Sequence, residues 1–166
     1  MALQSISETR AKLGADPAAA VVTPAVTARL LNGHARLSAG PFNWDADLSP
    51  VLGGGNLAPS PTNYLLGALA GCAVTFLTDT LAPEFGVRID DVTAVARCTS
   101  DLRGLVGIDG APAALSGLEL EIEIASPDGP ERTDPMLAAW RERCPIYLAL
   151  LGANDIGLTS RIAAVV

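Results

Sequence analysis

Hydrophobic and polar positions alternate most regularly at residues 118–124, where the sequence reads LELEIEI. Because successive side chains of a strand point to opposite faces, this pattern predicts a strand with its glutamates in water. The side chains expected on its inner face are those of Leu118, Leu120, Ile122 and Ile124. Residues 92–99 are rich in β-branched side chains and predict another strand, with Cys98 on the same face as Val92, Ala94 and Ala96. We therefore expect Cys98 to be an unreactive core thiol.

A helical period replaces this alternation after residue 60. Ser60 suits a helix N-cap and Pro61 suits the first helical position, where its missing N–H costs nothing. Apolar residues then recur at spacings of three and four, on one face as Leu65, Leu69, Cys72 and Phe76 and beside it as Leu66, Ala70, Ala73 and Leu77. The segment is apolar nearly all round until Asp79, and Pro83 and Gly86 close it. We expect this helix at the centre of the structure.

Short extended runs precede the helix, between residues 26 and 47, and turn residues separate them. The pair Asn32-Gly33 predicts a hairpin, and we expect His34 to be an exposed turn residue. Residues 48–61 are rich in Gly and Pro and predict an irregular loop. Its glycines do not form a phosphate-binding loop, which needs Lys and Ser or Thr next, where Asn56-Leu57 stand. We expect them to permit a close backbone approach.

The last third of the chain predicts a broken helix. Residues 134–143 have a helical pattern, Cys144-Pro145 interrupts it, and a second helical piece starts at Pro145. Residues 156–166 predict a closing strand, whereas the Ala-rich residues 1–25 predict a loose or helical arm. Strands and helices in this mixed order indicate an α+β fold, with a single domain over residues 26–166.

Composition narrows the possible functions. The 166 residues suit one domain, and they are 49% hydrophobic and only 17% charged, with a net charge of −7. This charge disfavours binding to nucleic acid or to an anionic membrane surface. The most apolar stretch, residues 64–77, is shorter than the roughly 18 residues that a bilayer span needs. The first residues contain no apolar signal segment, so we expect a cytoplasmic protein.

Three cysteines are the candidates for chemistry. Their number is too small and odd for a disulfide framework, and a zinc site is not expected because no CxxC pair exists and His34 is the single histidine. Cys144 can occupy a helix N-cap, where backbone N–H groups lower a thiol pKa, and Arg141 and Arg143 can act in the same direction. By composition alone, however, Cys72 and Cys144 are better explained as buried structural thiols.

Two motifs in this order resemble a known family. The run LGGGNLAPSPTNYLLGALAGC at residues 52–72, followed by RCPIY at 143–147, is similar to the OsmC/Ohr family of osmotically induced and organic hydroperoxide resistance proteins. The resemblance covers residues 26–166 and implies an OsmC-like α+β fold and an intertwined homodimer, which would bury the excess apolar surface. It implies a peroxidase that needs no metal or other cofactor. Cys72 would attack the hydroperoxide and become a sulfenic acid, and Cys144 would resolve it as a disulfide that a dithiol such as dihydrolipoamide reduces.

One feature departs from the family pattern. The family usually has a glutamate one or two residues after the helix-starting proline, paired with an arginine from the N-terminal strands, but Thr62 and Asn63 stand here. Arg36 is our choice for that arginine, with Arg29 the other candidate. Without the glutamate, burial raises the pKa of Cys72 unless the arginine alone offsets it. This predicts a slower peroxidase or, alternatively, a non-catalytic member that senses redox state or binds an acyl or lipoyl-like ligand. A thiol hydrolase or transferase, a third possibility, would have only His34 as a base.

Overall fold

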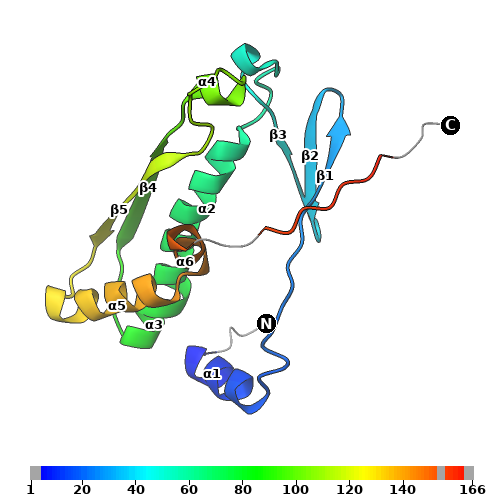
Figure 1. Ribbon diagram of the computed structural model, residues 1–166. Helices are drawn as coiled ribbons and strands as arrows, with labels where there is room; N and C mark the ends of the chain where they lie inside the picture. Colours follow the sequence, from blue (N-terminus) through cyan, green and yellow to red (C-terminus); the bar gives the residue numbers. More distant parts are fainter. Residues whose placement is uncertain (1–4, 153–155, 163–166) are drawn as a thin grey trace.

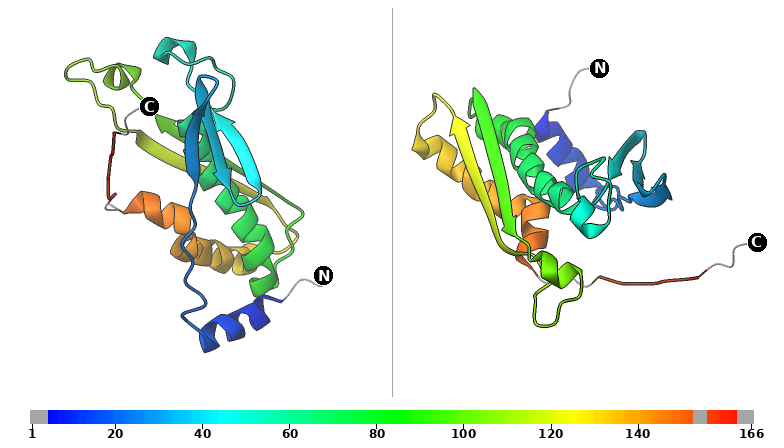
Figure 2. Two further views of the ribbon diagram at one scale, coloured as in Figure 1. Left: turned by 90° about the vertical axis from the view of Figure 1, so that its right-hand side faces the viewer. Right: turned by 90° about the horizontal axis from the view of Figure 1, so that it is seen from above.

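The computed structural model describes residues 5–152 and 156–162, and it has the mixed α+β architecture that the sequence predicts. A long central helix, α2 (Pro61–Phe76), lies against a two-stranded sheet on one side, while a separate three-stranded sheet stands on its other side (Figure 1). The two sheets are not hydrogen-bonded to each other. The fold therefore consists of a helical core with one sheet packed on it and a second sheet projecting from it (Figure 2).

The central helix begins at the predicted residue and ends at Gly86 as predicted, although Pro83 does not interrupt it. The Ser60 hydroxyl oxygen accepts a hydrogen bond from the Asn63 N–H at 3.2 Å, and Pro61 occupies the first turn. The helix continues through a π-helical turn, η2 (Leu77–Leu81), into α3 (Ala82–Phe85), which Gly86 ends in the left-handed conformation. The buried core gathers along this helix and comprises Ala73, Leu77, Leu81, Ala82, Val87, Met136, Ala139, Trp140 and Cys144.

The continuous helix Pro61–Phe85 is longer than the fourteen-residue apolar stretch from which a membrane span was judged too short. Its 25 residues are long and apolar enough to cross a bilayer, so the fourteen-residue stretch alone does not exclude a span. The core helix of a soluble protein passes the same test, and this helix carries Asp79 and Glu84 and packs against β4 and α5. Only 28% of its most apolar window is buried within one chain. Much of its apolar surface is thus left for another contact.

The two predicted strands form the sheet on the core. Strands β4 (Asp91–Thr99) and β5 (Ser116–Ala125) pair antiparallel, with an irregularity between Arg97 and Thr99. The predicted inward orientation is confirmed for Leu120, Ile122 and Ile124, which are partly buried, and is wrong for Leu118, which is exposed. Leu118 lies at the irregularity itself, between Glu119, which pairs with Arg97, and Ser116, which pairs with Thr99. Between the strands, α4 (Leu102–Leu105) interrupts the connection.

The predicted hairpin belongs to a three-stranded antiparallel sheet. It contains β1 (Thr27–Leu31), β2 (His34–Ala39) and β3 (Phe42–Ala46) in chain order, and Asn32 and Gly33 take the positive φ angles that the tight turn requires. Cross-strand pairing places the small and apolar residues on one face: Ala28, Leu30, Ala35, Leu37, Trp44 and Ala46. Leu30 remains 81% exposed, so parts of this face lack a cover within the chain.

The Gly-rich loop is organised by a buried carboxylate, Asp47, and contains a short 3-10 turn, η1 (Pro50–Leu52). The two oxygens of Asp47 accept backbone hydrogen bonds from Leu48, Gly55 and Leu57 at 2.8–3.0 Å. A Cβ atom at Gly54 would collide with the carbonyl group of Leu48. The expected close backbone approach is therefore confirmed at this glycine.

The chain ends confirm one prediction and correct another. The N-terminal arm contains a helix, α1 (Ile6–Ala15), with a capping box between Ser5 and Glu8. The broken helix consists of α5 (Pro130–Arg143), which starts four residues before the predicted position, and α6 (Pro145–Leu151). The predicted closing strand is wrong for residues 156–162, which extend away from the core with Leu158 90% exposed (Figure 1). An alternating pattern forms no strand without a neighbouring strand to pair with; residues 163–166 lie outside the described chain.

Candidate active site: two facing thiols

Cys72 and Cys144 lie next to each other although 72 residues separate them in the sequence. Their Sγ atoms are 3.1 Å apart, and both are free thiols. Cys144 is fully buried in the core, while Cys72 is partly buried and packs against the same cluster. The structure therefore brings together the two cysteines that the motifs single out.

The break between α5 and α6 holds Cys144 in place. Its backbone is extended, with φ −69° and ψ 113°, because Pro145 disfavours a helical residue before it. The Cys144 N–H donates to the Trp140 carbonyl at 2.8 Å, and its carbonyl accepts from Leu148 at 3.0 Å. The Trp140 and Tyr147 rings, 5.1 Å apart, pack from one helix to the other. Cys144 thus ends one helix and caps the next, as predicted, although its side chain forms no capping hydrogen bond.

Burial dominates the acid–base behaviour of Cys72. The pKa of Cys72 is raised to about 11: burial is the largest cause, the hydrogen bond and charge of the neighbouring Cys144 also raise it, and a hydrogen bond from the Ile146 backbone N–H lowers it. An N–H group at the start of α6 thus acts on Cys72. This upward shift is the one predicted for a site without the family glutamate.

Arg143, one of the two cations expected to act on Cys144, forms an ion pair with Glu84. Its Nη1 atom lies 2.9 and 3.3 Å from the two carboxylate oxygens of Glu84 on α3, which Arg10 of the N-terminal helix also contacts at 2.8 Å. The Arg143 guanidinium also lies 6.0 Å from the centre of the Phe85 ring. The charge of Arg143 is therefore balanced by Glu84.

Arg36 forms an ion pair on its own sheet. Its Nε atom lies 2.8 Å from an oxygen of Asp45 on β3, and the same oxygen lies 3.3 Å from His34 Nε2. In the described part of the chain, no hydrogen bond or ion pair joins Arg36 to either cysteine. Arg29 lies directly opposite Arg36 on the neighbouring strand, so the register leaves both arginines as candidates. The expectation for His34 is wrong: it begins β2 and its side chain is only 14% exposed, because Asp45 faces it.

Asn63, at a position where the family usually has a glutamate, takes part in capping helix α2. Asn63 accepts a hydrogen bond from the Ser60 hydroxyl at 2.6 Å and returns one through its N–H, so its side chain completes the cap. One residue later, the Tyr64 hydroxyl donates to the Asp45 carbonyl. This bond attaches the three-stranded sheet to the helix that carries Cys72.

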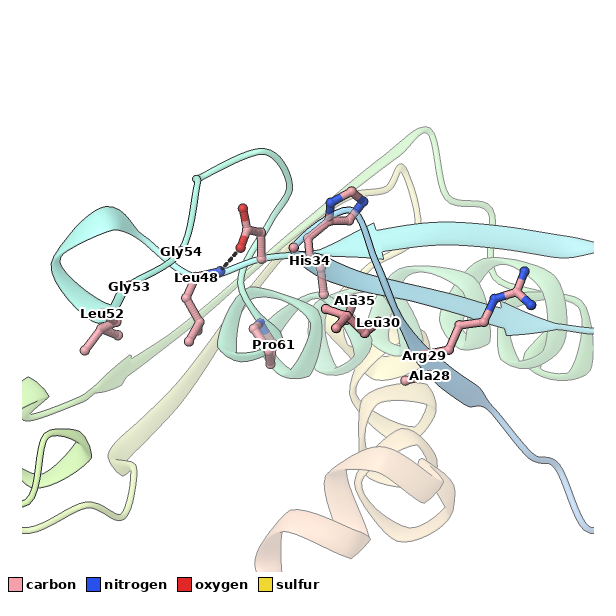
Figure 3. Close-up of a pocket in the computed structure, with 13 residues that line it drawn as sticks. Ala28, Arg29, Leu30, His34, Ala35, Leu48, Leu52, Gly53, Gly54 and Pro61 are labelled. Carbon is pink, nitrogen blue, oxygen red and sulfur yellow. Dashed lines mark hydrogen bonds between the residues drawn. The ribbon is translucent and has the colours of Figure 1, made fainter. Parts of the chain in front are cut away.

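Two pockets adjoin these elements. One, of about 440 Å³, lies between the apolar face of the three-stranded sheet and the Gly-rich loop. In Figure 3, Leu30 and Ala35 lie on the side of the sheet nearer Pro61. The other, of about 230 Å³, is lined mainly by apolar side chains around Leu69 and Tyr147, each three residues from one of the facing cysteines. Because it includes a close sequence neighbour of each cysteine, the second pocket is the better candidate for holding an organic ligand near the thiols.

Sequence reasoning did not predict which carboxylates pair with Arg36 and Arg143. Asp45 has a signal in the sequence, because the hairpin register predicts which residue lies across from Arg36. Glu84 has none, since its contacts with Arg10 and Arg143 join residues 74 and 59 positions away. Among the described residues, no group of three or more His, Cys, Asp or Glu side chains could hold a metal ion.

Comparison with known proteins identifies the family. The family model of OsmC-like protein matches residues 53–159. Among solved structures, an OsmC-like protein from Mycoplasma pneumoniae is 20% identical, with a TM-score of 0.66 over 79% of this chain and 89% of that one. An organic hydroperoxide resistance protein OsmC from Legionella pneumophila is 18% identical, with a TM-score of 0.59 over 80% and 91%. OhrB of Bacillus subtilis is also 18% identical, with a TM-score of 0.51 over 79% and 92%.

The comparison with curated proteins found no match. The family model, however, covers more than half of the chain, including Cys72 and Cys144, and the structural neighbours share the α+β fold. The chain belongs to the OsmC-like protein family.

Proposed function

We propose that this protein is a thiol-dependent peroxidase that reduces organic hydroperoxides to alcohols. The observation that carries the proposal is the 3.1 Å contact between the sulfur atoms of Cys72 and Cys144. A sulfenic acid formed on one of them has a thiol within bonding reach, as a disulfide-forming peroxidase requires. The likeness to proteins named for organic hydroperoxide resistance, from Legionella pneumophila and Bacillus subtilis, supports the substrate class.

The reaction consumes one hydroperoxide and two thiols. The Cys72 thiolate attacks one oxygen of the O–O bond, the alkoxide leaves and takes a proton to give the alcohol, and Cys72 becomes a sulfenic acid. The Cys144 sulfur then attacks the Cys72 sulfur and releases water, which leaves a disulfide. A dithiol such as dihydrolipoamide reduces this disulfide by two thiol–disulfide exchanges and restores both thiols.

The surroundings of the thiols favour an organic substrate. The pocket around Leu69 and Tyr147 also contains leucine side chains from β5 and α6. Two of its lining residues, Leu69 and Tyr147, each lie three residues from one of the cysteines, and an apolar wall binds the alkyl part of a hydroperoxide better than it binds hydrogen peroxide. Arg36 remains our choice for the residue that favours the Cys72 thiolate.

The protein is further proposed to be a cytoplasmic homodimer. Helix α2 keeps most of its apolar window uncovered in one chain, and Leu30 and Phe42 of the three-stranded sheet are 81% and 70% exposed. A second copy of the chain would cover these surfaces and bring its own three-stranded sheet. Residues 26–166 would form the domain, with residues 1–25 as an arm.

The test is to count thiols before and after one equivalent of an alkyl hydroperoxide, and then to map any disulfide by peptide mass spectrometry. We expect rapid loss of two thiols and a Cys72–Cys144 link, with Cys98→Ser reacting like the unaltered protein. Cys72→Ser should abolish the reaction. Arg36→Ala should slow it, whereas Arg29→Ala should not. Unchanged thiols at neutral pH would contradict the peroxidase proposal.

A non-catalytic role is the second candidate, and the raised pKa of Cys72 favours it. A thiol that stays protonated reacts slowly with peroxides, and Asn63 caps a helix where the family usually has a glutamate. In that case the pocket around Leu69 and Tyr147 would hold an acyl or lipoyl-like ligand, or the cysteine pair would sense redox state. Binding of an octanoyl compound without any turnover of hydroperoxide would support this candidate.

A further inference from the structure

We propose that Glu84 is a positioning residue for closure of the Cys72–Cys144 disulfide, and that it acts through Arg143. The inference rests on the proposed function, because disulfide closure is the second step of that reaction. It assigns a role to the carboxylate of α3, which lies outside the thiol site itself.

The contact joins the two elements that carry the thiols. Glu84 belongs to the continuous helix that also carries Cys72, and Arg143 is the last residue of α5, directly before Cys144. One nitrogen of Arg143 contacts both carboxylate oxygens of Glu84, at 2.9 and 3.3 Å. The contact thereby holds the end of α5, and with it Cys144, against the helix that carries Cys72.

The surroundings make this ion pair more than an ordinary surface contact. The Glu84 side chain is only 15% exposed, and Phe85 lies beside the Arg143 guanidinium. Arg10 of α1 adds a second cation to the same carboxylate at 2.8 Å. A partly buried carboxylate with two cationic partners holds its neighbours more firmly than an isolated exposed pair.

Closure of the disulfide depends on this placement. The Cys144 sulfur must approach the Cys72 sulfenic acid along the S–O bond axis, displace its oxygen as water and form the S–S bond. A looser end of α5 lowers the fraction of time in which the sulfurs are aligned. The preceding attack on the hydroperoxide does not require alignment of the Cys144 sulfur, and a displaced Cys144 would not slow it, because the neighbouring Cys144 raises the pKa of Cys72.

The test compares Glu84→Gln with Glu121→Gln, a matched control in which the same change removes an exposed ion pair to Arg97 on the β4–β5 sheet. Sulfenic acid formation is timed at low alkyl hydroperoxide, where it limits the rate, and disulfide closure is timed at hydroperoxide concentrations high enough for closure to limit the rate. We expect Glu84→Gln to slow closure by about threefold to tenfold without slowing sulfenic acid formation. Glu121→Gln should change neither rate. Closure at the unaltered rate in a folded Glu84→Gln protein would overturn the inference.

Two further measurements distinguish a positioning role of the Glu84–Arg143 contact from a general loss of folded structure. Arg143→Gln should slow closure as Glu84→Gln does, the double variant should be no slower than either, and Arg143→Lys should recover part of the rate. If Glu84→Gln fails to fold, the Arg143 variants provide the test alone. Equilibration with a glutathione redox buffer measures dithiol pairing without any peroxide, so a protein inert toward hydroperoxides would refute the proposed function while still testing Glu84. An unchanged disulfide equilibrium in both variants would refute the role of Glu84.

Discussion

Replacing Cys144 by serine should make Cys72 more acidic. Burial is the largest cause of its raised pKa, and the hydrogen bond and charge of Cys144 are the next. Serine retains a hydroxyl that can donate to a thiolate and does not ionise, so Cys144→Ser removes the second and third causes and leaves the first. The pKa of Cys72 should therefore fall below about 11 but stay above its ordinary value of 9.0.

The size of the effect follows from the thiolate fraction. At pH 7, a pKa of about 11 leaves about one Cys72 in ten thousand ionised, against about one in a hundred for an unperturbed thiol. Alkylation by iodoacetamide follows this fraction, because the thiolate is the nucleophile. Cys144→Ser should accelerate alkylation of Cys72 at neutral pH, by less than about a hundredfold.

The assay follows alkylation of the Cys72 peptide by mass spectrometry from pH 7 to 11, in a Cys98→Ser background. The rate should rise with pH throughout this range when Cys144 is present and level off earlier in Cys144→Ser. A Cys72 that is already fully reactive at pH 7 would refute the reasoning, because another charge would then outweigh burial. Equal pH profiles with and without Cys144 would refute the role of the neighbouring thiol.

The remaining predictions concern the scaffold and are tested by thermal unfolding. The pKa of Asp47 is lowered, and the largest cause is its hydrogen bond from the Leu57 backbone N–H. The ionised Asp47 therefore stabilises the fold at pH values above its unfolded pKa near 4, and this stabilisation is lost as the pH falls through its folded pKa. Asp47→Asn should thus destabilise at pH 7, and the difference from the unaltered protein should shrink in acid; a constant difference would contradict this. Gly54→Ala should destabilise the loop, whereas Gly14→Ala, with no atoms within 4 Å of the new methyl, should not. Leu77→Ala, at a fully buried position, should cost about 2–5 kcal/mol, and a loss below about 1 kcal/mol would contradict its place in the core.

Local sequence patterns were enough to predict where helices and turns begin, whereas contacts between distant residues could not be predicted from them. The N-cap at Ser60, the tight turn at Asn32-Gly33 and the break at Cys144 all follow from local rules, and the structure has them as predicted. The end of the central helix at Gly86 was predicted too, but the π-helical turn Leu77–Leu81 was not, and Pro83 lies in the first turn of α3 instead of closing the helix. The closing strand was wrong because alternation shows only that a segment suits a sheet, whereas a strand also needs a partner.

The candidate site was predictable only in part, for the same reason. Cys72 and Cys144 were paired by resemblance to a family, and nothing in their spacing requires two residues so far apart to touch. The charges around them depend on partners that the sequence does not indicate, as the contact of Arg143 with Glu84 shows. Arg36 was selected as a cation for Cys72, yet within the described chain its ion pair is with Asp45.

The same contact has opposite effects on the two steps of the proposed reaction. With Cys144 at 3.1 Å, the thiolate of Cys72 is disfavoured, so attack on the hydroperoxide should be the slow step. Once Cys72 is a sulfenic acid, its charge no longer matters and the nearby Cys144 sulfur should close the disulfide quickly. The sulfenic acid should therefore not accumulate when both thiols are present, and dimedone should capture it in Cys144→Ser but hardly at all in the unaltered protein. Comparable capture in both proteins would mean that the sulfurs do not keep this distance during the reaction.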